Sequence, residues 1–152
     1  MGDAIMEWSN DYDVLKLKNQ ICFPIYATSN MITRKYKPLL DKLDLTYTQY
    51  ITMMVLWEKK NINVKNLGTS LFLDSGTLTP LLKKLEAKEY ITRTRDKNDE
   101  RNVIISITKE GESLKSKAID VPKTMAENVN LNQDDAETLY RILYKLLEND
   151  VN

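Results

Sequence analysis

The chain has 152 residues, 22 of them basic and 22 acidic, with one cysteine, Cys22, and no histidine. This length and ordinary globular composition indicate one folded domain and argue against a disordered chain. Without histidine, Ser–His and Cys–His nucleophiles and histidine-ligated metals are excluded, and one cysteine cannot close a disulfide within the chain. We therefore expect no cofactor, no metal and a reducing compartment.

The sequence contains no apolar run of about 18 residues, the length that a membrane-spanning helix needs. Residues 1–13 include four acidic side chains in place of the basic region that opens a signal peptide. These features predict a cytoplasmic protein with no membrane partner.

Charge is distributed unevenly along the chain. From Lys59 to Lys109 there are 11 basic and 6 acidic residues, a net charge of +5, so the two ends together carry −5. A basic middle between acidic ends is typical of a protein in which one region faces phosphate.

In chain order, the first element is a helix expected over residues 14–35, where apolar residues recur every four positions. Pro24 lies inside this range and predicts a lost backbone hydrogen bond and a kink beside Cys22. A short separate helix is expected over residues 37–43.

Three further helices follow in the middle of the chain. Thr46 is the expected N-cap of a helix with a buried face formed by Tyr50, Met53, Met54 and Trp57. A short helix is expected over residues 64–71. Asp74 and Ser75 offer capping oxygens to a further helix that ends near Lys88, with an apolar face formed by Leu78, Leu81, Leu82 and Leu85. The last two form a helix-turn-helix unit.

The residue pattern then changes to a β-hairpin. Residues 90–95 and 103–108 are rich in β-branched side chains, and the charged turn 96–102 joins them. A helix-turn-helix followed directly by a hairpin is the order of a winged helix. We therefore expect a mainly α fold with a small β-hairpin (α+β).

The chain becomes helical again after Gly111, and Asn132 is the expected cap of a final helix with an apolar stripe that comprises Leu139, Ile142, Leu143, Leu146 and Leu147. A lobe over about 37–110 is too small to bury this stripe together with the first helix. We therefore expect one domain over 1–152 that forms a homodimer through helices at about 14–36 and 111–150.

The helix that starts at Ser75 is the candidate reader of DNA. Its start is small and hydroxyl-rich, which allows close approach to a duplex, and two lysines follow one turn later to hold phosphates. The candidate residues are Ser75, Gly76, Thr77, Thr79, Lys83 and Lys84. The alternative interpretation is an ordinary capped helix with a solvated polar face.

The tip of the hairpin is the second candidate contact. Arg101 is expected in the minor groove, where the negative potential favours a guanidinium, with Asp99 orienting it. A surface ion pair with no role in DNA binding is the alternative.

At these residues the sequence resembles the MarR family of bacterial regulators. Residues 99–108 are similar to its wing motif, in which Asp, any residue and Arg precede an aliphatic strand that ends in Thr, and the likeness extends from about residue 17 to 147. The resemblance implies a homodimeric transcriptional regulator, expected to be a repressor, on a near-palindromic double-stranded DNA operator.

Within this family the chain resembles the OhrR organic-hydroperoxide sensors and their staphylococcal relatives, on residues 19–23, 36–43, 45–47 and 73–80. The resemblance implies that Cys22 is the sensing cysteine and that Tyr36 and Tyr47 of the partner subunit donate hydrogen bonds to its sulfur. Tyr26 lies one turn beyond Cys22 on the same helix face.

The implied mechanism starts from a thiolate, which phenol donors stabilise and which peroxide oxidises to a sulfenic acid. Because no second cysteine is present, a low-molecular-weight thiol then forms a mixed disulfide, and operator affinity falls. Three alternatives stay open: a regulator released by a small aromatic or phenolic ligand with Cys22 inert, a thiol peroxidase, and a winged helix that binds only protein.

Overall fold

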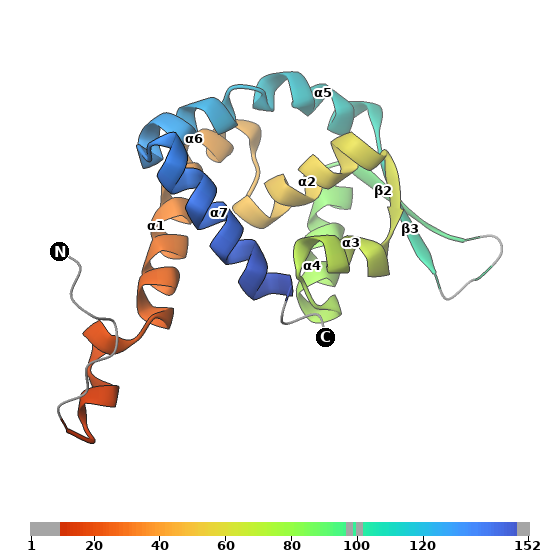
Figure 1. The fold of residues 1–152 in the computed structure, drawn as a ribbon. Coiled ribbons are helices and arrows are strands. Elements are labelled where there is room, and N and C mark those ends of the chain that lie inside the picture. The colour runs from red at the N-terminus through yellow and green to blue at the C-terminus, as the bar shows by residue number, and fades with distance from the viewer. Residues whose placement is uncertain (1–9, 97–98, 100–101, 149–152) are drawn as a thin grey trace.

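The computed structural model describes residues 10–96, 99 and 102–148, and Arg101 lies outside this range. The fold is mainly helical with one small antiparallel sheet, which confirms the expected class (Figure 1). The 3₁₀ turns are η1 (Asp13–Leu15), η2 (Leu17–Asn19) and η3 (Asp41–Leu43). The helices are α1 (Cys22–Leu40), α2 (Tyr47–Lys59), α3 (Val64–Leu71), α4 (Ser75–Ala87), α5 (Lys109–Ala118), α6 (Val121–Val129) and α7 (Gln133–Glu148). The strands are β1 (Asn61–Asn63), β2 (Ile91–Arg95) and β3 (Val103–Ile107).

The predicted helix-turn-helix is formed by α3 and α4, and the predicted hairpin by β2 and β3. Their register pairs Ile91 with Ile107 and Arg95 with Val103, and β1 adds to the other edge of β3 to give the order β1-β3-β2. Strand β1 was not predicted, because three residues with one apolar side chain give no period-2 signal. The arrangement is a winged helix.

The core of the lobe is formed by α2 and α4. Leu78, Leu81, Leu82 and Leu85 of α4 are buried as expected, together with Tyr50, Met53, Leu56 and Trp57 of α2. The prediction that Met54 is buried was wrong, because it is 45% exposed. The buried face of α2 is centred on Met53 and Leu56, and at 100° per residue Met54 lies beyond its edge.

Helix α5 extends this core beyond the hairpin. The Trp57 indole donates a hydrogen bond to the Gly111 carbonyl at 2.9 Å, and a Cβ on Gly111 would lie 2.2 Å from the Tyr90 carbonyl oxygen. Leu114 and Ala118 are buried in the same cluster. The close approach at Gly111 therefore seats α5 on the lobe.

The start of the chain differs from the prediction. Instead of one helix over 14–35 with a kink at Pro24, η1 and η2 precede α1, which begins at Cys22. Pro24 is then the third helical residue, where a backbone N–H has no partner within the helix, so proline costs nothing there. The end of α1 also differs, because residues 37–43 form its last turn and η3 rather than a separate helix.

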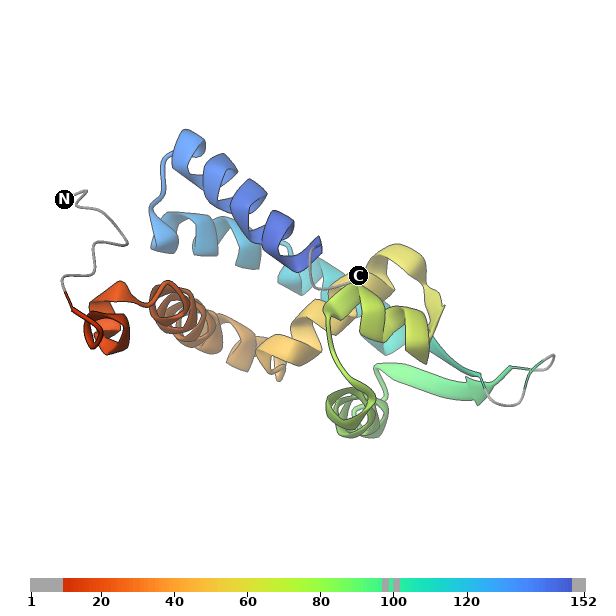
Figure 2. The ribbon, with the colours of Figure 1, turned by 60° about the horizontal axis from the view of Figure 1, so that its bottom comes forward.

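Helix α7 starts as predicted, with the Asn132 side chain accepting a hydrogen bond from the Asp135 N–H at 2.8 Å. All of its residues except Leu143 are exposed, including most of the apolar stripe. Figures 1 and 2 show the start of α1, with η1 and η2, projecting away from the lobe on the side opposite the β2–β3 hairpin. None of the helices in residues 10–96 and 102–148 combines the length and apolar character that a membrane span requires.

Candidate functional site

The start of α4 is fixed by the Asp74 side chain. Its Oδ1 accepts the Thr77 N–H at 2.9 Å, and its Oδ2 accepts the Thr77 hydroxyl at 2.9 Å. These hydrogen bonds, the backbone one first, hold the pKa of the Asp74 carboxyl below its usual range. A Cβ on Gly76 would lie 3.0 Å from Asp74 Oδ1, so the glycine leaves room for the cap.

The predicted base-facing residues Ser75, Gly76, Thr77 and Thr79 are all exposed at this end of α4. Thr79 donates its hydroxyl hydrogen to the Ser75 carbonyl at 2.7 Å, and Thr77 donates its own to Asp74. Each hydroxyl oxygen therefore keeps lone pairs that can accept a further hydrogen bond. Lys83 and Lys84, about one turn beyond Thr79, are exposed and form no ion pair with another described residue.

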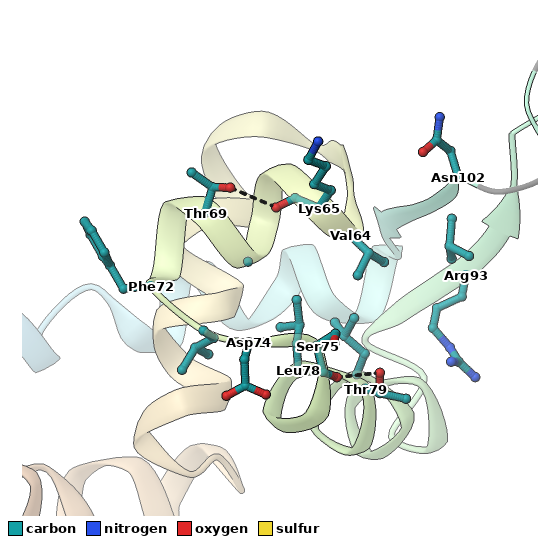
Figure 3. A pocket seen from close by; sticks show the side chains of 14 residues that line it. Val64, Lys65, Thr69, Phe72, Asp74, Ser75, Leu78, Thr79, Arg93 and Asn102 are labelled. Carbon is teal, nitrogen blue, oxygen red and sulfur yellow. Dashed lines mark hydrogen bonds between the residues drawn. The ribbon is translucent and has the colours of Figure 1, made fainter. Parts of the chain in front are cut away.

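A hollow of about 850 Å³ lies between α3, α4 and the hairpin (Figure 3). Its apolar lining includes Leu78, Leu82 and Val103, and its polar lining includes Lys65, Thr69, Asp74, Ser75, Thr79, Arg93 and Asn102. The structure thus brings the start of α4 and the turn end of the hairpin to one concave surface.

At the hairpin turn, Asp99 interacts with Asn102. The Asp99 carbonyl accepts the Asn102 N–H at 2.9 Å, and Asp99 Oδ2 accepts the Asn102 amide at 3.1 Å. Because Arg101 lies outside the described residues, its pairing with Asp99 stays a prediction.

The candidate cysteine site is divided between two places on the chain. Cys22 is the first residue of α1 and is exposed, and Tyr26 one turn later is 66% exposed. Tyr36 and Tyr47 lie at the other end of α1, with ring centroids 4.9 Å apart. At 1.5 Å per residue, the 14 residues from 22 to 36 put about 21 Å of helix between the thiol and this tyrosine pair.

Tyr36 also packs against Tyr50, with ring centroids 5.9 Å apart. Burial raises the pKa of Tyr36 and Tyr47, and proximity to Tyr47 adds to the shift of Tyr36. Burial raises the pKa of Tyr50 to about 12. The three phenols therefore stay protonated at neutral pH, so Tyr36 and Tyr47 keep O–H groups that can donate hydrogen bonds.

Residues 34–118, more than half of the chain, match a family model described as transcriptional regulator SarA/Rot. The organic hydroperoxide resistance transcriptional regulator of Bacillus subtilis is 49% identical over 139 residues, which cover 91% of this chain and 95% of that protein. The regulator SarZ of Staphylococcus aureus is 44% identical over 123 residues, covering 81% of this chain and 83% of SarZ.

Structures of AbfR, a protein solved from Staphylococcus epidermidis, are also similar. Reduced AbfR bound to DNA is 28% identical, with a TM-score of 0.77 over 94% of this chain and 100% of AbfR. The TM-score is 0.76 for overoxidised AbfR bound to DNA and 0.64 for disulfide-formed AbfR. This chain belongs to the MarR family of DNA-binding transcriptional regulators.

The family resemblance read from the sequence is therefore confirmed, whereas the residue roles in this MarR-family regulator stay predictions. Three residues that line the α3–α4–hairpin hollow were not among the predicted site residues: Lys65, Arg93 and Asn102. Lys65 contributed to the basic middle of the chain, but no local pattern indicates that it lines the same hollow as Asn102, about 37 positions later.

Proposed function

We propose that this regulator is a cytoplasmic, homodimeric repressor that releases its operator after organic hydroperoxide oxidises Cys22. The observation that carries the proposal is the separation of Cys22 from the packed Tyr36–Tyr47 pair along a helix with an exposed apolar surface. In the proposed dimer, a second copy of the chain supplies the tyrosine pair that Cys22 does not reach within its own chain.

The dimer is inferred from apolar side chains that one chain leaves exposed on the N-terminal segment, α1 and α7: Ile21, Phe23, Ile25, Leu139, Ile142, Leu146 and Leu147. Burying apolar surface is the main driving force of stable association. If two α1 helices cross in opposite directions about a two-fold axis, Cys22 of each chain approaches Tyr36 and Tyr47 of the partner subunit. The single domain then comprises dimerisation helices at its two ends and a winged-helix lobe between them.

The proposed chemistry begins at the Cys22 thiolate, stabilised by O–H donors from the partner subunit's tyrosines and from Tyr26. The sulfur attacks the outer peroxide oxygen, an S–O bond forms, the O–O bond breaks, and the alkoxide leaves as the alcohol after taking a proton from solvent. The sulfenic acid then condenses with a low-molecular-weight thiol, which forms a mixed disulfide and releases water.

In the reduced dimer, two α4 helices enter successive major grooves about 34–36 Å apart on a near-palindromic operator. Thr77 and Thr79 accept hydrogen bonds from base amino groups, and Lys83 and Lys84 bind phosphates. Lys65 and Asn102 border the path of the DNA backbone between the two grooves, and Arg101, oriented by Asp99, reaches the minor groove.

The similarity to AbfR suggests which oxidised state releases DNA. Overoxidised AbfR is described as bound to DNA, and the present conformation is more similar to the two DNA-bound forms than to disulfide-formed AbfR. We infer that the added volume of a mixed disulfide, rather than oxygen on sulfur alone, separates the two chains enough to lower affinity.

A mobility-shift titration on the DNA upstream of its own gene tests this proposal. Cumene hydroperoxide followed by a thiol is expected to weaken binding by the wild type about a hundredfold, which needs about 2.7 kcal/mol of differential stability. Cys22→Ser is expected to bind the same DNA and to ignore both reagents. Release of the Cys22→Ser protein by peroxide would reject the redox mechanism.

One observation favours a second candidate, a regulator released by a small aromatic or phenolic ligand. A second hollow of about 500 Å³ lies beside Tyr47 and is lined by Arg34, Leu40 and Leu45 among others. Its apolar floor and exposed guanidinium fit a phenolic acid. In this case salicylate releases the Cys22→Ser protein as readily as the wild type, and peroxide has no effect on either.

A further inference from the structure

An ion pair joins the recognition helix to the wing. Oε2 of Glu86, near the end of α4, accepts hydrogen bonds from Nε of Arg93 at 2.8 Å and from its Nη2 at 2.5 Å. Arg93 is the central residue of β2. The Glu86 side chain is 37% exposed and the Arg93 side chain is 29% exposed. The bonds from Arg93 lower the pKa of the Glu86 carboxyl.

Arg93 also lines the hollow between α3, α4 and the hairpin. Figure 3 shows its guanidinium directed toward α4 and away from Lys65 and Asn102. The hollow therefore has a second cationic side chain at its edge, but a carboxylate already neutralises that charge. An arginine released from Glu86 could turn toward a DNA backbone that follows the rim.

We propose that Glu86 limits sequence-independent DNA affinity, because it withholds the Arg93 guanidinium from DNA phosphate. This inference rests on the proposed DNA binding. Phosphate contacts strengthen binding to every duplex alike, whereas base contacts strengthen binding to the operator only. Neutralising one cation at the rim therefore lowers sequence-independent affinity and leaves base reading intact.

The Glu86–Arg93 ion pair is expected to contribute little to folding stability. Partly exposed ion pairs contribute little to stability, since solvent screens them. We therefore expect Glu86→Gln to change the melting temperature little and to act mainly on DNA binding.

The test measures the affinity of the full-length, reduced protein for an operator duplex and a scrambled duplex between 50 and 200 mM KCl by fluorescence anisotropy. Glu86→Gln is expected to raise affinity for the scrambled duplex and for the operator by a similar factor. One added phosphate contact per lobe steepens the salt dependence of DNA binding. For a dimer, the affinity of Glu86→Gln is expected to fall roughly tenfold more than that of the wild type between 50 and 200 mM KCl. Arg93→Gln is expected to change either affinity little, and the double variant is expected to match Arg93→Gln.

Glu89→Gln is the matched control. It removes the same charge three residues further along the chain, and the Glu89 side chain forms no ion pair with the described residues. The proposal is overturned if Glu86→Gln acts no more strongly than Glu89→Gln, if its effect persists without Arg93, or if it weakens both duplexes equally. A wild type that shows no salt-dependent binding to either duplex would instead contradict the proposed function itself.

Discussion

The phenols of Tyr36, Tyr47 and Tyr50 form a packed group at the junction of α1 and α2, and Tyr50 contacts Trp57 edge-on with ring centroids 6.2 Å apart. Aromatic pairs in such tilted and edge-on arrangements stabilise a core beyond their burial alone. Tyr50 is 2% exposed, so its phenol is held neutral, whereas Tyr36 and Tyr47 are half-buried. Tyr50 thus packs in the core, whereas Tyr36 and Tyr47 at its edge keep hydroxyl groups that can donate hydrogen bonds.

Tyr50 makes folding stability depend on alkaline pH. Its pKa in the folded protein is about 12, above the usual 10, so its contribution is fully present below pH 10 and is lost as pH rises through 12. In urea unfolding, the wild type is expected to lose more stability from pH 10 to 12 than Tyr50→Phe, which has no phenol to ionise. Equal losses in both proteins would contradict this assignment.

At the scale of the element, the start of α4 depends on one side chain. Asp74 binds both the backbone and the hydroxyl of Thr77, so it fixes the first turn and the direction of the Thr77 oxygen together. Because hydrogen bonds lower its pKa, this contribution is present above the ordinary carboxyl pKa and is lost as pH falls through the lower folded value.

Asp74→Ala is expected to lower the melting temperature by a few degrees and to weaken operator binding, since the first turn of α4 loses its cap. Asp74→Asn keeps a capping oxygen and is expected to retain most of both properties. Differential scanning fluorimetry and anisotropy measure the two effects. Unchanged operator affinity in Asp74→Ala would show that the cap does not position the reading surface.

The sequence predicts the elements that are set by residues close together in the chain, and it does not predict features that depend on tertiary contacts. The cap at Asp74, the leucine stripe of α4 and the β-branched runs of β2 and β3 are local signals, and the structure confirms them. The kink at Pro24 was wrong because the effect of a proline depends on where the helix begins. The Glu86–Arg93 pair and the hollow arise only when the hairpin folds back on α4, so no local pattern indicates them.

At the scale of the whole molecule, the candidate sensor is incomplete in one chain. The thiol and the tyrosine pair lie at opposite ends of α1, and α7 exposes an apolar stripe that one copy leaves uncovered. A dimer accounts for both features. The proposed dimer also places the sulfur between two chains, where we expect an attached thiol to change the spacing of the two lobes.

The most direct test is the rate of Cys22 oxidation in a purified heterodimer of one Cys22→Ser chain and one Tyr36→Phe/Tyr47→Phe chain, followed by dimedone labelling and mass spectrometry. Its only cysteine lies on the chain without the two phenols, and the partner subunit carries both. The account predicts oxidation by cumene hydroperoxide at the wild-type rate, roughly tenfold or more above the Tyr36→Phe/Tyr47→Phe homodimer, which lacks hydrogen bonds to a charged sulfur. Oxidation as slow as in that homodimer would contradict a site shared between two chains.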